Sequence, residues 1–118
     1  QVEDKRRRLA QIEAMIAEFT RMSTDLDREI AAEEKRAGIA DPSHFAYPTY
    51  ARAAMTRREN VQRSRNELED ELAEARAALD EARGELAKVE SLDGRERMAE
   101  AARERDLDAM SAMQAARI

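Results

Sequence analysis

Side chains that commonly do chemistry are present in this chain, but their types and spacing do not form a catalytic group. His44 is the only histidine, and no cysteine is available as a nucleophile or a thiolate ligand. The carboxylates Glu67, Glu69, Asp70 and Glu71 fall within a helical pattern, largely on its outward faces. A histidine without partners and carboxylates in solvent lack the geometry for acid–base work or metal binding. We therefore expect no enzyme activity, no cofactor and no metal.

Aromatic side chains are concentrated in one short segment of the chain. Phe45, Tyr47 and Tyr50 lie within six residues, and Phe19 is the only other aromatic residue. They can close the open end of a helix pair, against Ala37, Ile39 and Ala54. They can also anchor a partner, because exposed aromatic side chains often dominate binding energy. The closing role is the preferred interpretation, and the three aromatics remain candidates for partner binding.

A second group of candidates lies near the end of the sequence. Leu107, Met110 and Met113 are apolar positions in a charged segment, and flexible methionines suit adaptable binding surfaces. The chain begins at Gln1, and Lys5–Arg8 would oppose the positive end of a helix dipole, so we expect the natural helix to begin further upstream. Additional upstream residues, a second copy in a weak homodimer or another protein could then cover the tail.

Two long helices must position these side chains. Apolar residues recur alternately every three and four positions, which is typical of a coiled coil. The first such seam contains Val2, Leu9, Ile12, Ile16, Phe19, Leu26 and Ile30; the second contains Ala54, Val61, Leu68, Leu72, Ala75, Leu79, Ala82, Leu86 and Val89. We predict an all-α fold, a single antiparallel two-helix coiled-coil hairpin over residues 1–118. Helix one should cover residues 2–37, the turn 38–48, and the long helix two 49–117.

The residues between the seams predict where the helices stop. Gly38 suits the left-handed position after a helix end, and Asp41-Pro42 suggests a short helical turn over residues 42–45. Pro48 or Thr49 should open helix two, since the tyrosine before a proline is held in an extended conformation.

The seams also predict a register in which the numbers of facing residues add to about 87 or 88. Facing pairs are then Leu26–Val61, Phe19–Leu68, Ile16–Leu72, Ile12–Ala75, Leu9–Leu79, Lys5–Ala82 and Val2–Leu86. In this register Ser23 meets Arg65, a polar layer of the kind that specifies register in coiled coils.

Composition and charge exclude several classes of protein. Of 118 residues, 42% are hydrophobic and 40% charged, proportions that are typical of coiled coils. The net charge of −5 argues against a nucleic-acid-binding role and against binding to an anionic membrane. Without a long apolar run or a signal peptide, we expect a cytoplasmic protein that reaches a membrane only through its partners.

Two stretches carry a resemblance to a known family. The segment DPSHFAYPTYARAAMTRREN, residues 41–60, and the segment KVESLDGRERMAEAARERDLDAM, residues 88–110, resemble members of the flagellar export protein FliJ family. The order of a charged first helix, a turn and a longer second helix is also similar. Members of that family carry aromatic residues near the end of helix one, whereas Arg28–Gly38 has none here.

The resemblance implies a small component of the flagellar type III export apparatus, at the cytoplasmic face of the flagellar base. Such proteins bind the export ATPase ring and the export gate protein, and they handle empty substrate chaperones without catalysis of their own. The alternative is a coiled-coil spacer or scaffold segment of a larger cytoplasmic protein. A nucleic-acid-binding helical arm is a weaker alternative because the chain has no basic stripe.

Overall fold

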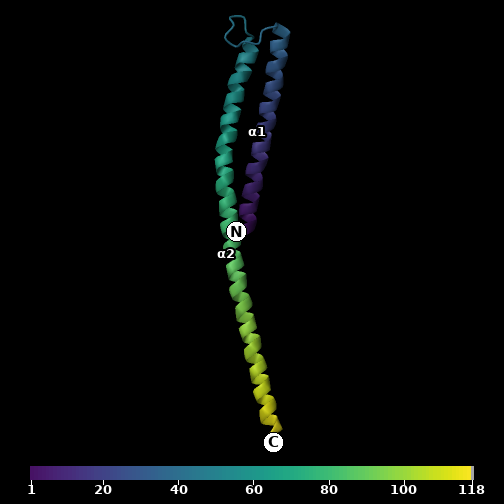
Figure 1. Cartoon of the computed structure of the whole chain (residues 1–118), viewed down its shortest axis with the longest axis vertical. Helices are drawn as coiled ribbons and strands as arrows, with labels where there is room; N and C mark the ends of the chain where they lie inside the picture. Colours follow the sequence, from purple (N-terminus) through teal and green to yellow (C-terminus); the bar gives the residue numbers. More distant parts are fainter. Residues whose placement is uncertain (118) are drawn as a thin grey trace. The chain divides into compact units, whose positions relative to one another are not determined.

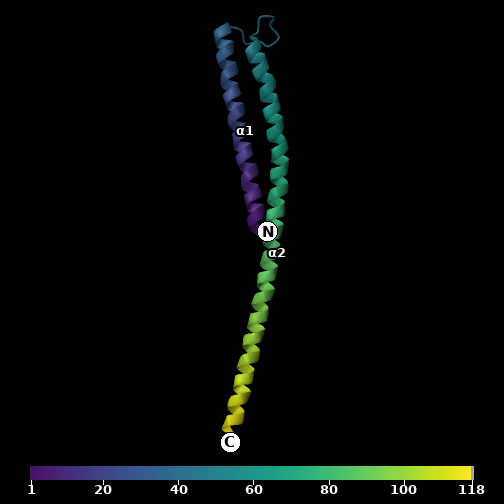
Figure 2. The ribbon, with the colours of Figure 1, turned by 180° about the vertical axis from the view of Figure 1, so that it is seen from behind.

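The protein is all-α, an antiparallel hairpin of two helices, as the sequence predicts. A computed structural model describes residues 1–117 and contains α1 (Val2–Ala37) and α2 (Thr49–Ala116). α1 lies beside the first part of α2 and runs in the opposite direction (Figure 1). The view from behind shows the same two helices side by side along this part (Figure 2). The chain forms two compact units, Gln1–Leu79 and Asp80–Ile118, which are described separately below.

Two apolar clusters hold α1 against α2 within the unit Gln1–Leu79. Nearer the loop, Leu26, Ile30 and Ala54 form a buried cluster, with Met55 and Val61 packed against it. Further from the loop, the buried residues are Ile12, Leu68 and Leu72, and the residues packed on them are Leu9, Ile16, Phe19 and Ala75. The predicted pairs Leu26–Val61, Phe19–Leu68, Ile16–Leu72 and Ile12–Ala75 each fall within one cluster, which agrees with the predicted register.

Between the two clusters lie Ser23 and Arg65, the two residues of the predicted polar layer. Ser23 is buried, but its hydroxyl accepts a hydrogen bond of 3.4 Å from the Nε2 atom of Gln62. The Nε atom of Arg65 is buried without a hydrogen bond. The sequence thus located the buried polar positions, and the structure adds Gln62 as the hydrogen-bond donor to Ser23.

The seam of α2 is buried over a shorter length than predicted. Ala82 is the last buried residue of the seam, whereas Leu86 is 46% exposed and Val89 61% exposed. Both residues belong to the unit Asp80–Ile118, whose described part is helix ending in a turn. The side chains of Leu86 and Val89 are therefore accessible to solvent.

Charged side chains form local pairs along the exposed surface of α1. Five acidic residues are each followed three positions later by an arginine that contacts them: Glu3–Arg6, Asp4–Arg7, Glu18–Arg21, Asp25–Arg28 and Glu33–Arg36. Two further ion pairs join the helices, Asp27–Arg58 at 2.8 Å and Arg8–Glu71 at 3.5 Å. Exposed pairs of this kind contribute little stability, and the apolar clusters therefore carry the association of the helices.

Candidate partner-binding site

The loop between the helices is built from a helix cap and two consecutive turns. Gly38 adopts the left-handed conformation with φ 69°, and the N–H groups of Gly38 and Ile39 both donate to the carbonyl oxygen of Glu34. These bonds satisfy the carbonyl left free at the end of α1. The short turn predicted over residues 42–45 is the first of two consecutive turns. In the first turn the His44 N–H donates to the Asp41 carbonyl, and in the second the Tyr47 N–H donates to the His44 carbonyl.

Side chains of the loop reinforce these turns. Asp41 Oδ1 accepts hydrogen bonds from the backbone N–H and the hydroxyl of Ser43, and these bonds lower the pKa of Asp41 below its usual 3.8. His44 Nδ1 accepts a hydrogen bond from the backbone N–H of Ala46, and its ring stacks on Phe45 with centroids 4.7 Å apart. The single histidine thus has a structural role in the loop, and its Nδ1 atom is occupied by the backbone.

The structure separates the three aromatic candidates. Tyr47 is 4% exposed, Tyr50 is 54% exposed, and Phe45 is 96% exposed. The Tyr47 hydroxyl donates to Glu34 at 2.8 Å and lies 3.5 Å from the sulfur of Met55, while the Arg52 guanidinium lies over its ring. Tyr47 therefore closes the end of the helix pair and is out of reach of a partner. Phe45 alone among the three presents its whole ring to solvent.

Tyr50 has an intermediate position on the first turn of α2. Its hydroxyl donates to Glu29 of α1 at 3.2 Å, so part of its polar surface is already used within the hairpin. The exposed remainder of its ring lies on the same end of the hairpin as Phe45. The loop end can therefore offer one complete aromatic anchor and one partial anchor.

The environment of Tyr47 makes the hairpin sensitive to alkaline pH. Burial raises the pKa of Tyr47 above its usual 10.0; the hydrogen bond to Glu34 and the charge of Glu34 raise it further, while Arg52 and Arg58 oppose the rise. Because folding raises the pKa of Tyr47, the protonated hydroxyl contributes its full stabilisation below about pH 10. This stabilisation is lost as the pH rises through the pKa of Tyr47 in the folded protein. We expect the urea midpoint to fall above pH 10, and to fall less in Tyr47→Phe. Equal alkaline losses in both proteins would contradict this assignment.

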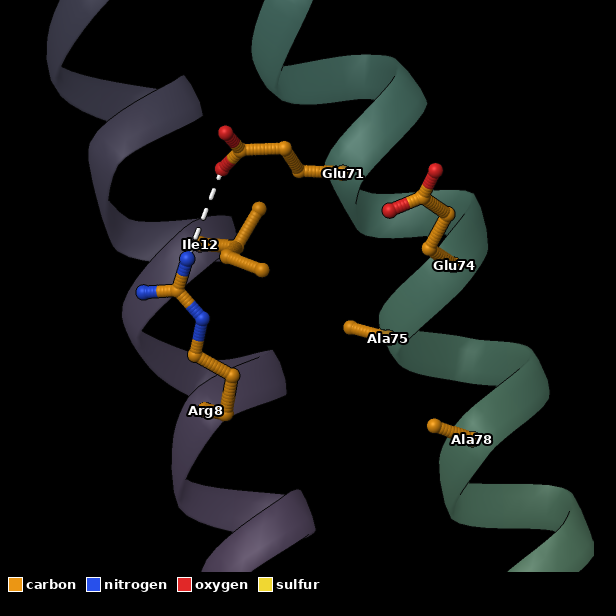
Figure 3. A pocket seen from close by; sticks show the side chains of 6 residues that line it. All are labelled: Arg8, Ile12, Glu71, Glu74, Ala75 and Ala78. Atoms are coloured by element: carbon orange, nitrogen blue, oxygen red, sulfur yellow. Dashed lines mark hydrogen bonds and ion pairs between the residues drawn. The ribbon is translucent and has the colours of Figure 1, made fainter.

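An open groove lies between the helices far from the loop. It has a volume of about 350 Å³ and is lined by Arg8, Ile12, Glu71, Glu74, Ala75 and Ala78. Figure 3 shows Arg8 and Glu71 reaching toward one another across the groove, with the small side chains of Ala75 and Ala78 facing the space. The groove exists because alanines face α1 here. Its charged lining consists of the Arg8–Glu71 ion pair and Glu74.

The carboxylates of α2 are dispersed on exposed surface. Glu67, Glu69, Asp70 and Glu71 are all exposed, and Glu71 is held by Arg8. In residues 1–117, no three histidine, cysteine, aspartate or glutamate side chains come together in a way that could hold a metal ion. No helix of the described chain is long and apolar enough to cross a membrane.

The tail candidates all lie on exposed helix surface. Leu107 is 63% exposed, Met110 57% and Met113 62%. Met110 and Met113 border a shallow hollow that also involves Gln114 and Arg117. A second hollow lies earlier in the same unit, between Lys88, Ser91, Leu92 and Arg95. The unit thus carries two apolar regions, around residues 86–92 and 107–113, and the mainly charged segment between them contains the exposed Met98.

Comparison with protein family models, with curated proteins and with solved structures finds no match. The arrangement of the side chains therefore carries the functional argument.

Sequence analysis missed one further exposed apolar pair. Met15 and Met22 lie seven residues apart on α1 and are 45% and 37% exposed. Met15 comes three residues after Ile12 and Met22 three residues after Phe19, so both lie on the flank of the buried apolar stripe. Their heptad spacing places both methionines on one face of the coiled-coil helix, and this spacing could have identified them from the sequence.

Proposed function

We propose that this protein is a docking component of the flagellar type III protein export apparatus. In this proposal it couples the export ATPase ring to the export gate protein and receives empty substrate chaperones, at the cytoplasmic face of the flagellar base. The resemblance of residues 41–60 and 88–110 to the FliJ family supports it, and an antiparallel two-helix hairpin is the fold that the resemblance implies. The role needs binding surfaces and no catalytic group or cofactor.

The observation that carries the proposal is the exposure of Leu107, Met110 and Met113 on one unit of the chain. Large apolar side chains that remain in water are costly, and a contiguous group of them usually marks an interaction surface. A simple spacer helix has no need of such a group, so the exposure favours docking over the spacer alternative. We assign the tail to the export ATPase and the loop end, with Phe45 and Tyr50, to a second partner.

Removing the tail surface should abolish binding to the purified export ATPase. Deleting residues 100–118 removes the three apolar anchors, and binding measured by calorimetry should fall below detection. The hairpin should persist, because its buried clusters lie within residues 1–79. Circular dichroism of the deletion variant checks that most of the helix content is retained.

A full-length variant separates side-chain loss from helix loss. Leu107→Gln, Met110→Gln and Met113→Gln together should abolish ATPase binding, whereas a matched control with Glu104→Gln, Arg105→Gln and Asp108→Gln should bind normally. Normal binding by the deletion variant would show that the tail is not the ATPase site. Loss of ATPase binding in a Phe45→Ala, Tyr50→Ala variant would instead assign the ATPase to the loop end.

A further inference from the structure

One face of the unit Asp80–Ile118 has a palindromic order of side chains. The face is made of residues spaced three or four positions apart along the helix, with the adjacent Ala99 and Glu100 at its middle. In order they are Glu85, Val89, Leu92, Glu96, Ala99, Glu100, Arg103, Leu107, Met110 and Gln114. Three pairs of positions equally far from the midpoint between residues 99 and 100 are complementary, whereas Ala99 falls opposite Glu100 and Glu85 opposite Gln114. Val89 corresponds to Met110, Leu92 to Leu107, and Glu96 to Arg103, so apolar matches apolar and acidic matches basic.

We infer that this face pairs with the same face of a second copy of the chain, running antiparallel about a two-fold axis between residues 99 and 100. An isologous contact of this kind requires a self-complementary surface, which the palindrome provides. Val89 and Leu92 of each copy lie against Met110 and Leu107 of the other. Two apolar clusters form, one on each side of a charged centre.

The charges select this arrangement over its alternatives. In the antiparallel register, Glu96 of each copy meets Arg103 of the other. A parallel pair would set Glu96 against Glu96 and Arg103 against Arg103, and like charges in facing positions are repulsive. Sliding the antiparallel pair by three residues sets Glu96 against Glu100, and sliding it by seven sets Val89 against Arg103. Of these arrangements, only the inferred register matches both the apolar and the charged positions.

Exposure shows that the face is free to make this contact. Val89, Leu92, Leu107 and Met110 are each more than half exposed, and Glu96 and Arg103 are also exposed. Four apolar side chains from each copy would therefore leave water on pairing. With a charged centre and only two apolar clusters, we expect a dimer that dissociates on dilution.

The inference goes beyond the proposed function and does not depend on it. Both interactions would use Leu107 and Met110, so a chain in the dimer could not bind the ATPase through its tail. Self-pairing would then keep this surface covered until a partner displaces the second copy. The tests below use the purified chain alone, so their failure would leave the ATPase experiment unaffected.

Charge exchange tests the facing of Glu96 and Arg103. In sedimentation equilibrium the full chain should show a monomer–dimer equilibrium. Glu96→Arg alone should weaken the dimer about tenfold or more, because two arginines then face each other, and Arg103→Glu alone should do the same. The double variant Glu96→Arg, Arg103→Glu should restore dimerisation. Glu90→Arg makes the same charge change away from the paired face and should leave the dimer unchanged.

Cross-linking tests the direction of the two helices. The chain has no cysteine, so single cysteines can be introduced without background. Mixing a Leu92→Cys chain with a Leu107→Cys chain should give mainly the mixed disulfide on mild oxidation. These two positions are about 22 Å apart along one helix, at 1.5 Å per residue. A chain that stays monomeric up to high concentration, a double variant that fails to dimerise, or a predominance of Leu92→Cys homodisulfides would each overturn the inference.

Discussion

Replacing Leu72 with alanine should lower the free energy of unfolding by about 2–4 kcal/mol, the range typical of a large-to-small change at a buried leucine. Leu72 is 6% exposed and belongs to the cluster that holds α1 against α2 far from the loop. Truncation removes contacts with both helices and leaves a space beside Ala75, which is too small to fill it. Urea unfolding followed by circular dichroism at low temperature measures the change.

Glu69→Ala is the matched control for this prediction. Glu69 lies on the same helix, one turn away, and its side chain is exposed. Alanine has a somewhat higher helix propensity than glutamate, and exposed substitutions usually change stability by no more than about 0.5 kcal/mol. Similar losses for Leu72→Ala and Glu69→Ala would mean that Leu72 does not face α1.

Replacing Tyr47 with alanine should have the largest effect of any change in the loop. The substitution opens the end of the helix pair, removes the hydrogen bond to Glu34 and removes the ring under Arg52. We expect its urea midpoint to fall by an amount comparable to that of Leu72→Ala. Tyr47→Phe should have a smaller effect, because it keeps the ring and loses only the hydroxyl.

Phe45→Ala provides the comparison, since Phe45 is two residues away and almost fully exposed. Its loss should leave the urea midpoint nearly unchanged, because the side chain is 96% exposed and its ring stacks on that of His44. If Phe45→Ala were as destabilising as Tyr47→Ala, the ring of Phe45 would have to be buried in solution. The two variants therefore distinguish a structural aromatic residue from one available to a partner.

The fold could be predicted from local signals because each acts over a few residues. The alternation of apolar positions by three and four specifies helices with one buried stripe. Gly38 ends α1 because a residue without a Cβ adopts the left-handed conformation at little cost, and a proline precedes the first residue of α2. The register follows from matching two stripes, which is why the predicted pairs fall in the same apolar clusters.

The candidate sites were harder to predict because exposure depends on what lies nearby. Phe45, Tyr47 and Tyr50 have similar apolar rings, and sequence analysis left their roles open. The turns at Asp41 and His44 direct Tyr47 into the end of the helix pair and leave Phe45 in solvent. Likewise, Leu86 and Val89 continue the predicted seam in type and spacing, yet their side chains are exposed; periodicity along one helix does not specify what covers it.

Sequence alone determined that this chain forms two helices joined at residues 38–48 and that their apolar stripes face each other. These properties depend on periodicity and on the conformational limits of glycine and proline, which are properties of short segments. Tertiary structure decided that Gln62 donates a hydrogen bond to Ser23, that Tyr47 is buried while Phe45 is free, and that Leu86 and Val89 are exposed. Each of these three outcomes depends on how far a side chain reaches or on which element lies beside it. The spacing of residues along one helix encodes neither of these two causes.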